Sequence, residues 1–137
     1  AANIPIEYYP SLKRGVDLTL SNGDVYLNVD YTTDSAAPKS YAYCSDTLMD
    51  ERYFDTIRNC DTLYHEATFL HDMLARANET HHTTALQAAQ IANIVQAKRL
   101  LLGHFSSRYK TLGPILDEAK SLFEESELAI EGSTYSI

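Results

Sequence analysis

The sequence predicts a layered α/β protein with a mixed sheet and helices on one face of that sheet. Two observations indicate this class. Short apolar runs that suit strands alternate along the chain with longer segments of helical periodicity. In the clearest helical segment, the four alanines within residues 85–92 recur at three- and four-residue spacing. Such a stripe of small side chains lets a helix lie close against a sheet.

The first two strands are predicted as a hairpin. Residues 16–20 and 25–29 alternate apolar and polar side chains on either side of Asn22-Gly23, which is the strongest local hairpin signal. Asp50 can cap a helix over residues 50–58, and Pro114 suits the first turn of a helix over residues 114–125. Further strands are expected at 41–44, 61–65, 99–103 and 128–130, and further helices at 69–75 and from Thr83 or Thr84 to 98.

Length and composition predict a single domain over residues 1–137, large enough to bury a core. No segment approaches the ~18 consecutive apolar residues of a membrane span. The chain shows no basic and then apolar leader, and Cys44 and Cys60 are too few for a disulfide scaffold. We therefore expect no membrane association and a reducing, cytoplasmic compartment.

The formal net charge of the chain is −8. Because surfaces that bind nucleic acid are normally basic, this balance argues against such a surface on the chain itself. It does not argue against an active site to which a more basic part of a protein delivers a nucleic acid.

Polar residues follow several of the predicted strands at the point where each strand ends. Asp46 follows the third strand, Glu66 ends the fourth, His104 ends the fifth, and His82 stands just before the alanine-rich helix. In layered α/β proteins, ligands bind where strands deliver their carboxyl ends to loops. If the strands point the same way, these four residues converge, and the sequence predicts a metal or acid–base site at that edge.

Each of these residues also has an interpretation without function. Asp46 can be a turn or helix-cap residue, and Glu66 can be an ordinary carboxylate at a strand end. His82 can cap a helix, and His65, which follows an apolar stretch, is expected to be a hydrogen-bonded structural histidine. The segment after His104 is the least ordinary, because Ser106 and Arg108 are residue types that bind phosphate; the residues alone leave both interpretations open.

Several ordered motifs resemble the ribonuclease Z family, tRNA 3′-processing endonucleases of the metallo-β-lactamase fold. The similarity covers about residues 5 to 132, and one motif departs slightly, with Thr83 where the family usually has serine. The motifs are Leu12-Lys13-Arg14-Gly15, Cys44-Ser45-Asp46-Thr47, His65-Glu66-Ala67-Thr68-Phe69, His82-Thr83-Thr84-Ala85 with Gln87-Ala88-Ala89, and His104-Phe105-Ser106-Ser107-Arg108-Tyr109.

The resemblance implies roles for individual residues. Asp46 corresponds to a carboxylate that bridges two zinc ions, and His104 to a ligand of one of them. Glu66 and His82 correspond to a catalytic pair that acts near the leaving group. Ser106 and Arg108, in the last of the motifs, correspond to groups that hold the phosphate.

The family's His-x-His-x-Asp-His motif does not occur in this chain, whose histidines are at 65, 71, 81, 82 and 104. The chain therefore resembles the C-terminal half of the enzyme, that is, half of an αββα sandwich with an incomplete zinc site. We expect the chain by itself to be inactive and to expose an apolar sheet face, through which it forms a homodimer. Catalytic zinc generally takes three protein ligands, and Asp46 and His104 provide two.

The implied activity is zinc-dependent removal of 3′ trailers from precursor tRNA, by attack of an activated water on a phosphodiester. Two alternatives stay open. One is another hydrolase of the same superfamily that acts on small phosphodiesters or esters. The other is a non-catalytic domain that has kept the fold alone.

Overall fold

The computed structural model describes residues 4–137, whose contacts fall into two compact units within Ala1–Pro38 and Lys39–Ile137. The single domain over residues 1–137 stays a prediction. Among the described residues, none of the helices combines the length and the apolar character that crossing a membrane requires.

The first unit is a small hairpin flanked by helical turns. Its two strands pair antiparallel, which confirms the hairpin predicted around Asn22-Gly23. The prediction that the second strand runs to residue 29 was wrong, because the Asn28 N–H donates to Asp17 Oδ1 (2.7 Å) and a helical turn begins there. In chain order the elements are η1 (Ile6–Tyr8), α1 (Tyr9–Lys13), β1 (Leu18–Thr19), β2 (Val25–Tyr26) and α2 (Asn28–Tyr31).

The second unit is built on a four-stranded parallel sheet. Its strands lie in the order β3 (Tyr41–Cys44), β4 (Thr62–Glu66), β5 (Leu100–Gly103) and β6 (Ser126–Leu128). The prediction of a mixed sheet was wrong, since all neighbouring strands of this sheet are parallel. Each connection contains helical segments that return the chain to the edge where the previous strand began. The carboxyl ends of all four strands therefore lie at one edge.

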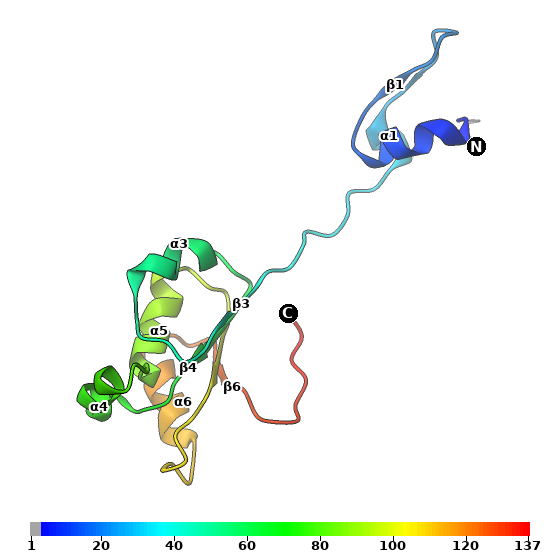
Figure 1. Cartoon of the computed structure of the whole chain (residues 1–137). Coiled ribbons are helices and arrows are strands. Elements are labelled where there is room, and N and C mark those ends of the chain that lie inside the picture. Colours follow the sequence, from blue (N-terminus) through cyan, green and yellow to red (C-terminus); the bar gives the residue numbers. More distant parts are fainter. Residues whose placement is uncertain (1–3) are drawn as a thin grey trace. The chain divides into compact units, whose positions relative to one another are not determined.

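Helical segments connect these strands: η2 (Glu51–Tyr53), α3 (Phe54–Ile57), η3 (His71–Met73), α4 (Leu74–Glu79), α5 (Ala85–Ile94) and α6 (Gly113–Lys120). The helices α3, α5 and α6 lie on the same side of the sheet, and the C-terminal segment, drawn in red, lies on the other (Figure 1). The predicted α/β class, with helices on one face, is confirmed.

The longest helix, α5, packs on the sheet through the predicted stripe of small residues. Its N-terminus carries a capping box between Thr84 and Gln87. The helix ends at Ile94 rather than at residue 98 because Gln96 has a left-handed backbone (φ 57°) and the Ala97 N–H closes the last turn. The residues of α5 that are fully buried are Ala85, Ala88, Ala89, Ile91 and Ala92.

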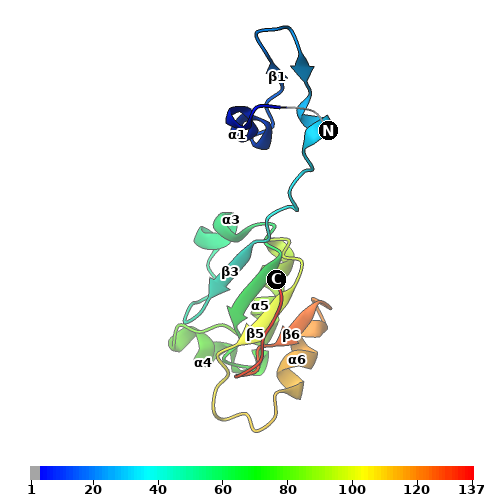
Figure 2. The same cartoon turned by 90° about the vertical axis from the view of Figure 1, so that its right-hand side faces the viewer.

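The two faces of the sheet differ in how they are covered. Leu63 and Leu100 on the helix side are fully buried, whereas Tyr41 and Tyr43 on the other side are 46% and 65% exposed. We call this second side the open face. The Tyr43 ring stacks on the Tyr64 ring with centroids 4.6 Å apart. The C-terminal segment crosses in front of this face (Figure 2) and borders a groove of about 510 Å³ on it.

Candidate metal centre

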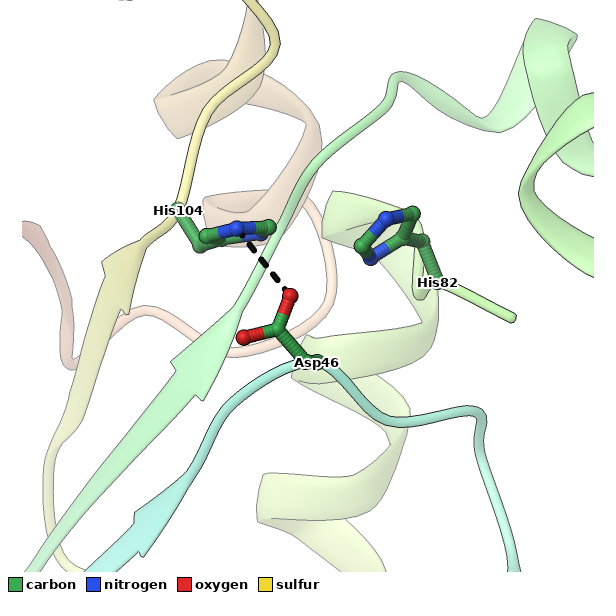
Figure 3. A group of neighbouring side chains, drawn as sticks. All are labelled: Asp46, His82 and His104. Atoms are coloured by element: carbon green, nitrogen blue, oxygen red, sulfur yellow. Dashed lines mark ion pairs between the residues drawn. The ribbon is translucent and has the colours of Figure 1, made fainter. Parts of the chain in front are cut away.

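Three polar side chains meet at the carboxyl edge of the sheet (Figure 3). Asp46 follows β3, His104 follows β5, and His82 comes shortly before α5. One potential ligand atom from each residue lies within 4.8 Å of those from the other two. The structure thus brings together residues that are far apart in sequence, at the edge where the sequence predicts a site; the roles assigned to them stay predictions.

The backbone around these residues adopts a conformation that side chains rarely favour. Asp46 and His104 have φ angles of 51° and 56°, and His81, just before His82, has a φ of 59°. Three of the five non-glycine residues with positive φ in the described part of the chain are therefore in or next to the cluster. Such conformations cost of order 1–3 kcal/mol each and are concentrated at functional sites.

The side chain of Glu66 is fully buried and lies at the centre of a hydrogen-bond network. Its Oε1 accepts from the Thr47 N–H (2.5 Å). Its Oε2 accepts from the Thr83 N–H (3.0 Å), the Thr68 hydroxyl (2.6 Å) and His82 Nδ1 (3.0 Å). We call Glu66 and these four partners the Glu66 network. It joins the segment after β3 to the segment before α5.

The Glu66 network fixes how the His82 ring is oriented. A carboxylate only accepts hydrogen bonds, so His82 Nδ1 must carry the proton that it shares with Glu66. The other ring nitrogen, Nε2, is then the one that is available to a metal ion or to a proton. The ring is 21% exposed and so lies at the boundary between the buried network and solvent.

Asp46 and His104 form a second, more open part of the cluster. His104 Nε2 lies 3.2 Å from Asp46 Oδ1, and the two side chains are 40% and 68% exposed. We call these two residues the Asp46–His104 pair. An imidazole nitrogen and a carboxylate oxygen are both donors that zinc accepts. The cluster therefore suits a zinc ion by its chemistry.

Ser106 and Arg108 lie on the loop that follows β5, beside the Glu66 network. The Ser106 N–H donates to the Thr68 carbonyl (3.1 Å). Arg108 Nε donates to Ser106 Oγ (3.2 Å), and its guanidinium lies over the Phe69 ring, 5.0 Å from the centroid. The Arg108 side chain is exposed, so its planar fork of donors is accessible to a phosphate.

His65 is the structural histidine that the sequence predicts. It is fully buried on the core side of β4, where Nδ1 contacts the Glu66 carbonyl (2.8 Å) and Nε2 contacts the Tyr53 hydroxyl (3.1 Å). Burial lowers the pKa of His65, because the charged ring would lose its hydration. His65 therefore supports the fold next to Glu66.

Sequence reasoning assigned no role to Thr68, yet its hydroxyl contacts both Glu66 and His104. The signal was present in the spacing, because a residue two positions after Glu66 in an extended segment points to the same side. The contributions of Thr47 and Thr83 are backbone N–H groups. Main-chain donors have no side-chain signature, so residue identity alone could not reveal them.

Solved structures define the class of fold. The metallo-β-lactamase fold protein YhfI from Bacillus subtilis superposes with a TM-score of 0.65 at 24% identity, over 72% of this chain and 40% of YhfI. A long-form RNase Z from yeast superposes with a TM-score of 0.51 at 32% identity, over 59% of this chain and 11% of that one. The second unit thus has the architecture of part of a metallo-β-lactamase fold.

Sequence comparison identifies the relatives within that class. The chain is 46% identical over 127 residues to ribonuclease Z from Cytophaga hutchinsonii, covering 92% of this chain and 41% of the relative. It is 43% identical over 134 residues to ribonuclease Z from Parabacteroides distasonis, covering 98% and 44%. No family model matches the chain. The chain is a homologue of ribonuclease Z that spans about two fifths of the length of these curated relatives, which fits the predicted C-terminal fragment.

Proposed function

We propose that this chain is the C-terminal part of a zinc-dependent, cytoplasmic endoribonuclease that removes 3′ trailers from precursor tRNA. One observation supports this most strongly. In a homologue of ribonuclease Z, the four residues Asp46, Glu66, His82 and His104 converge at one edge of the sheet.

Asp46 and His104 would hold the metal. A carboxylate has two oxygens and a negative charge, so Asp46 would help to hold the metal ions, and His104 would supply an imidazole nitrogen as a further ligand. Zinc, when bound, supplies activation of a water molecule and of the phosphate at neutral pH. Because a catalytic zinc ion generally takes three protein ligands, the Asp46–His104 pair needs further ligands from outside this chain.

Glu66 and His82 would handle the proton of the leaving group. Glu66 holds Nδ1–H of the ring. The imidazolium form of His82 would give its Nε2 proton to the ribose oxygen as the phosphodiester bond breaks, which leaves the ring neutral with its remaining proton on Nδ1. Ser106 and Arg108 would bind the phosphate that is being cleaved, since a hydroxyl and a guanidinium fork both suit phosphate oxygens.

The open face is where a missing part of the enzyme would pack. Exposed aromatic side chains on this face, Tyr41 and Tyr43, need an apolar partner. The curated relatives are more than twice as long as this chain, so that partner would be the preceding half with the His-x-His-x-Asp-His motif. When that half is absent, a second copy of this chain would cover the face, as a homodimer; sedimentation as a clean monomer at high concentration would contradict the homodimer.

The experiment compares this chain with the complete product of the gene that encodes it, using precursor tRNA with a 3′ trailer. We expect the complete product to cut at the 3′ end of the tRNA, and this chain by itself to be inert. A small phosphodiester serves as a control substrate. Cleavage of that control with no action on precursor tRNA would favour the other hydrolase, and inactivity on both would favour a non-catalytic domain.

A further inference from the structure

The Thr68 hydroxyl belongs to the Glu66 network and also contacts His104 of the Asp46–His104 pair. It contacts Glu66 Oε2 at 2.6 Å, His104 Nδ1 at 2.9 Å and the His104 carbonyl at 2.9 Å. A fourth contact, to His82 Nδ1, is longer at 3.4 Å. Thr68 is 6% exposed, so protein groups rather than water satisfy this hydroxyl. It links the buried and the open parts of the site.

The hydroxyl has a single proton, and its surroundings decide where that proton points. Glu66 Oε2 is a buried carboxylate oxygen at a distance typical of a charge-assisted O–H···O⁻ bond. If the hydroxyl pointed instead at His104 Nδ1, its oxygen lone pairs would face Glu66 Oε2 at 2.6 Å, and two acceptors at that distance repel. The proton therefore points to an oxygen acceptor, and a lone pair is left for His104 Nδ1.

We infer that Thr68 is a positioning residue that selects the ring tautomer of His104, with the proton on Nδ1 and the lone pair on Nε2. The bond on one ring nitrogen determines which nitrogen is free to bind a metal. Here Nδ1–H donates to Thr68, and Nε2 faces Asp46 Oδ1 at 3.2 Å. Two bare acceptors then face each other, which favours a cation between them. This inference deepens the proposed function and rests on it for the identity of that cation.

Thr68 also explains how one buried carboxylate serves both parts of the site. Glu66 accepts directly from His82 Nδ1, and it orients His104 through the Thr68 hydroxyl. Both rings then present Nε2 as the free nitrogen. The resulting arrangement needs a hydroxyl at residue 68, because a methyl group there can neither accept from His104 nor donate to Glu66.

The test reads the tautomer directly by NMR in this chain, without metal. Long-range proton–nitrogen correlations of the imidazole rings are recorded at a pH above the ordinary histidine pKa of about 6.5, and His104→Gln assigns the His104 signals. We expect the Nδ1–H form for His104 in the wild type and in Thr68→Ser. In Thr68→Val, whose side chain has the same shape without the hydroxyl, we expect the population to move to the Nε2–H form, which can donate to Asp46.

Two results would overturn the inference. One is an Nε2–H form of His104 in the wild-type chain, a measurement that does not depend on any variant folding. The other is an unchanged Nδ1–H population in a folded Thr68→Val. Backbone amide spectra show whether each variant is folded.

A second readout uses zinc affinity in the complete gene product. Loss of a group that orients a metal-bound histidine typically costs 10- to 100-fold in affinity. We expect a loss of this order for Thr68→Val and recovery of affinity in Thr68→Ser; equal affinity of the two would contradict the inference. The NMR experiment tests the tautomer without metal or tRNA, and precursor tRNA cleavage by the wild type tests the proposed function. The failure of one can therefore be distinguished from the failure of the other.

Discussion

The Glu66 network and the Asp46–His104 pair lie side by side but are built differently. Glu66 is fully buried and accepts four hydrogen bonds, whereas the side chains of Asp46 and His104 are 68% and 40% exposed and contact each other across 3.2 Å. Under the proposed function, this chain pre-organises the acid–base part of the site by itself. The part proposed to bind metal is then left open for ligands from elsewhere.

The largest expected effect on stability comes from removing the centre of the network. Glu66→Ala leaves the half-buried N–H of Thr47 and the buried N–H of Thr83 without an acceptor, and we expect a loss of about 3–5 kcal/mol in the free energy of unfolding. Asp46→Asn is the matched control, because asparagine also tolerates a left-handed backbone and the side chain is exposed. We expect its effect to stay within about 0.5 kcal/mol in chemical denaturation; equal losses in the two variants would contradict the comparison.

The second prediction separates the two parts by their functions, in the complete gene product. His82→Ala removes the proposed proton donor and should lower turnover by about 10²- to 10⁴-fold while leaving the bound zinc almost unchanged. Asp46→Asn should lose both zinc and activity. Metal analysis and single-turnover kinetics on the same samples measure both quantities. Loss of zinc in His82→Ala would instead make His82 a metal ligand.

The smallest expected effect is on acid sensitivity next to the network. The pKa of His65 is lowered in the folded state by burial, so below about pH 6.5 the unfolded chain binds a proton that the folded chain does not. Stability should therefore fall as the pH drops through that value, by at most about 1.4 kcal/mol per pH unit from this group. Denaturation at several pH values measures the slope.

Two variants show whether burial is the cause. His65→Gln should flatten the slope, because the titrating ring is gone. Tyr53→Phe removes the hydroxyl that contacts His65 Nε2 but keeps the His65 ring buried, so the slope should persist. A slope that is unaffected by His65→Gln would assign the acid sensitivity to another group.

Most elements of the second unit and the convergence of the site were predictable, and for a physical reason. The last strand lies at Ser126–Leu128 rather than at 128–130, and the last helix ends at Lys120 rather than at 125. Strand periodicity, the alanine stripe of α5 and the polar residues at strand ends are all local patterns that one edge of a parallel sheet brings together. The strand direction was not predictable in the same way. The parallel pairing of β3 with β4 depends on how η2 and α3 return the chain, and these segments are too short to give a clear periodic signal.

The backbone conformation and the hydrogen bonds within the site could not be predicted from the sequence. Asp46 and His104 have a left-handed backbone, which neither residue type requires. The N–H donors of Thr47 and Thr83 belong to the main chain, which every residue possesses. Only the coordinates show that Glu66 accepts from both.

Zinc retention tests most directly the claim that this chain holds one part of a shared metal site. Zinc content after desalting, together with precursor tRNA cleavage, is measured for this chain and for the complete gene product. The account predicts that this chain retains almost no zinc and cuts nothing, whereas the complete product retains zinc and cuts at the 3′ end of the tRNA. Tight stoichiometric zinc in this chain by itself, accompanied by cleavage of precursor tRNA, would contradict it.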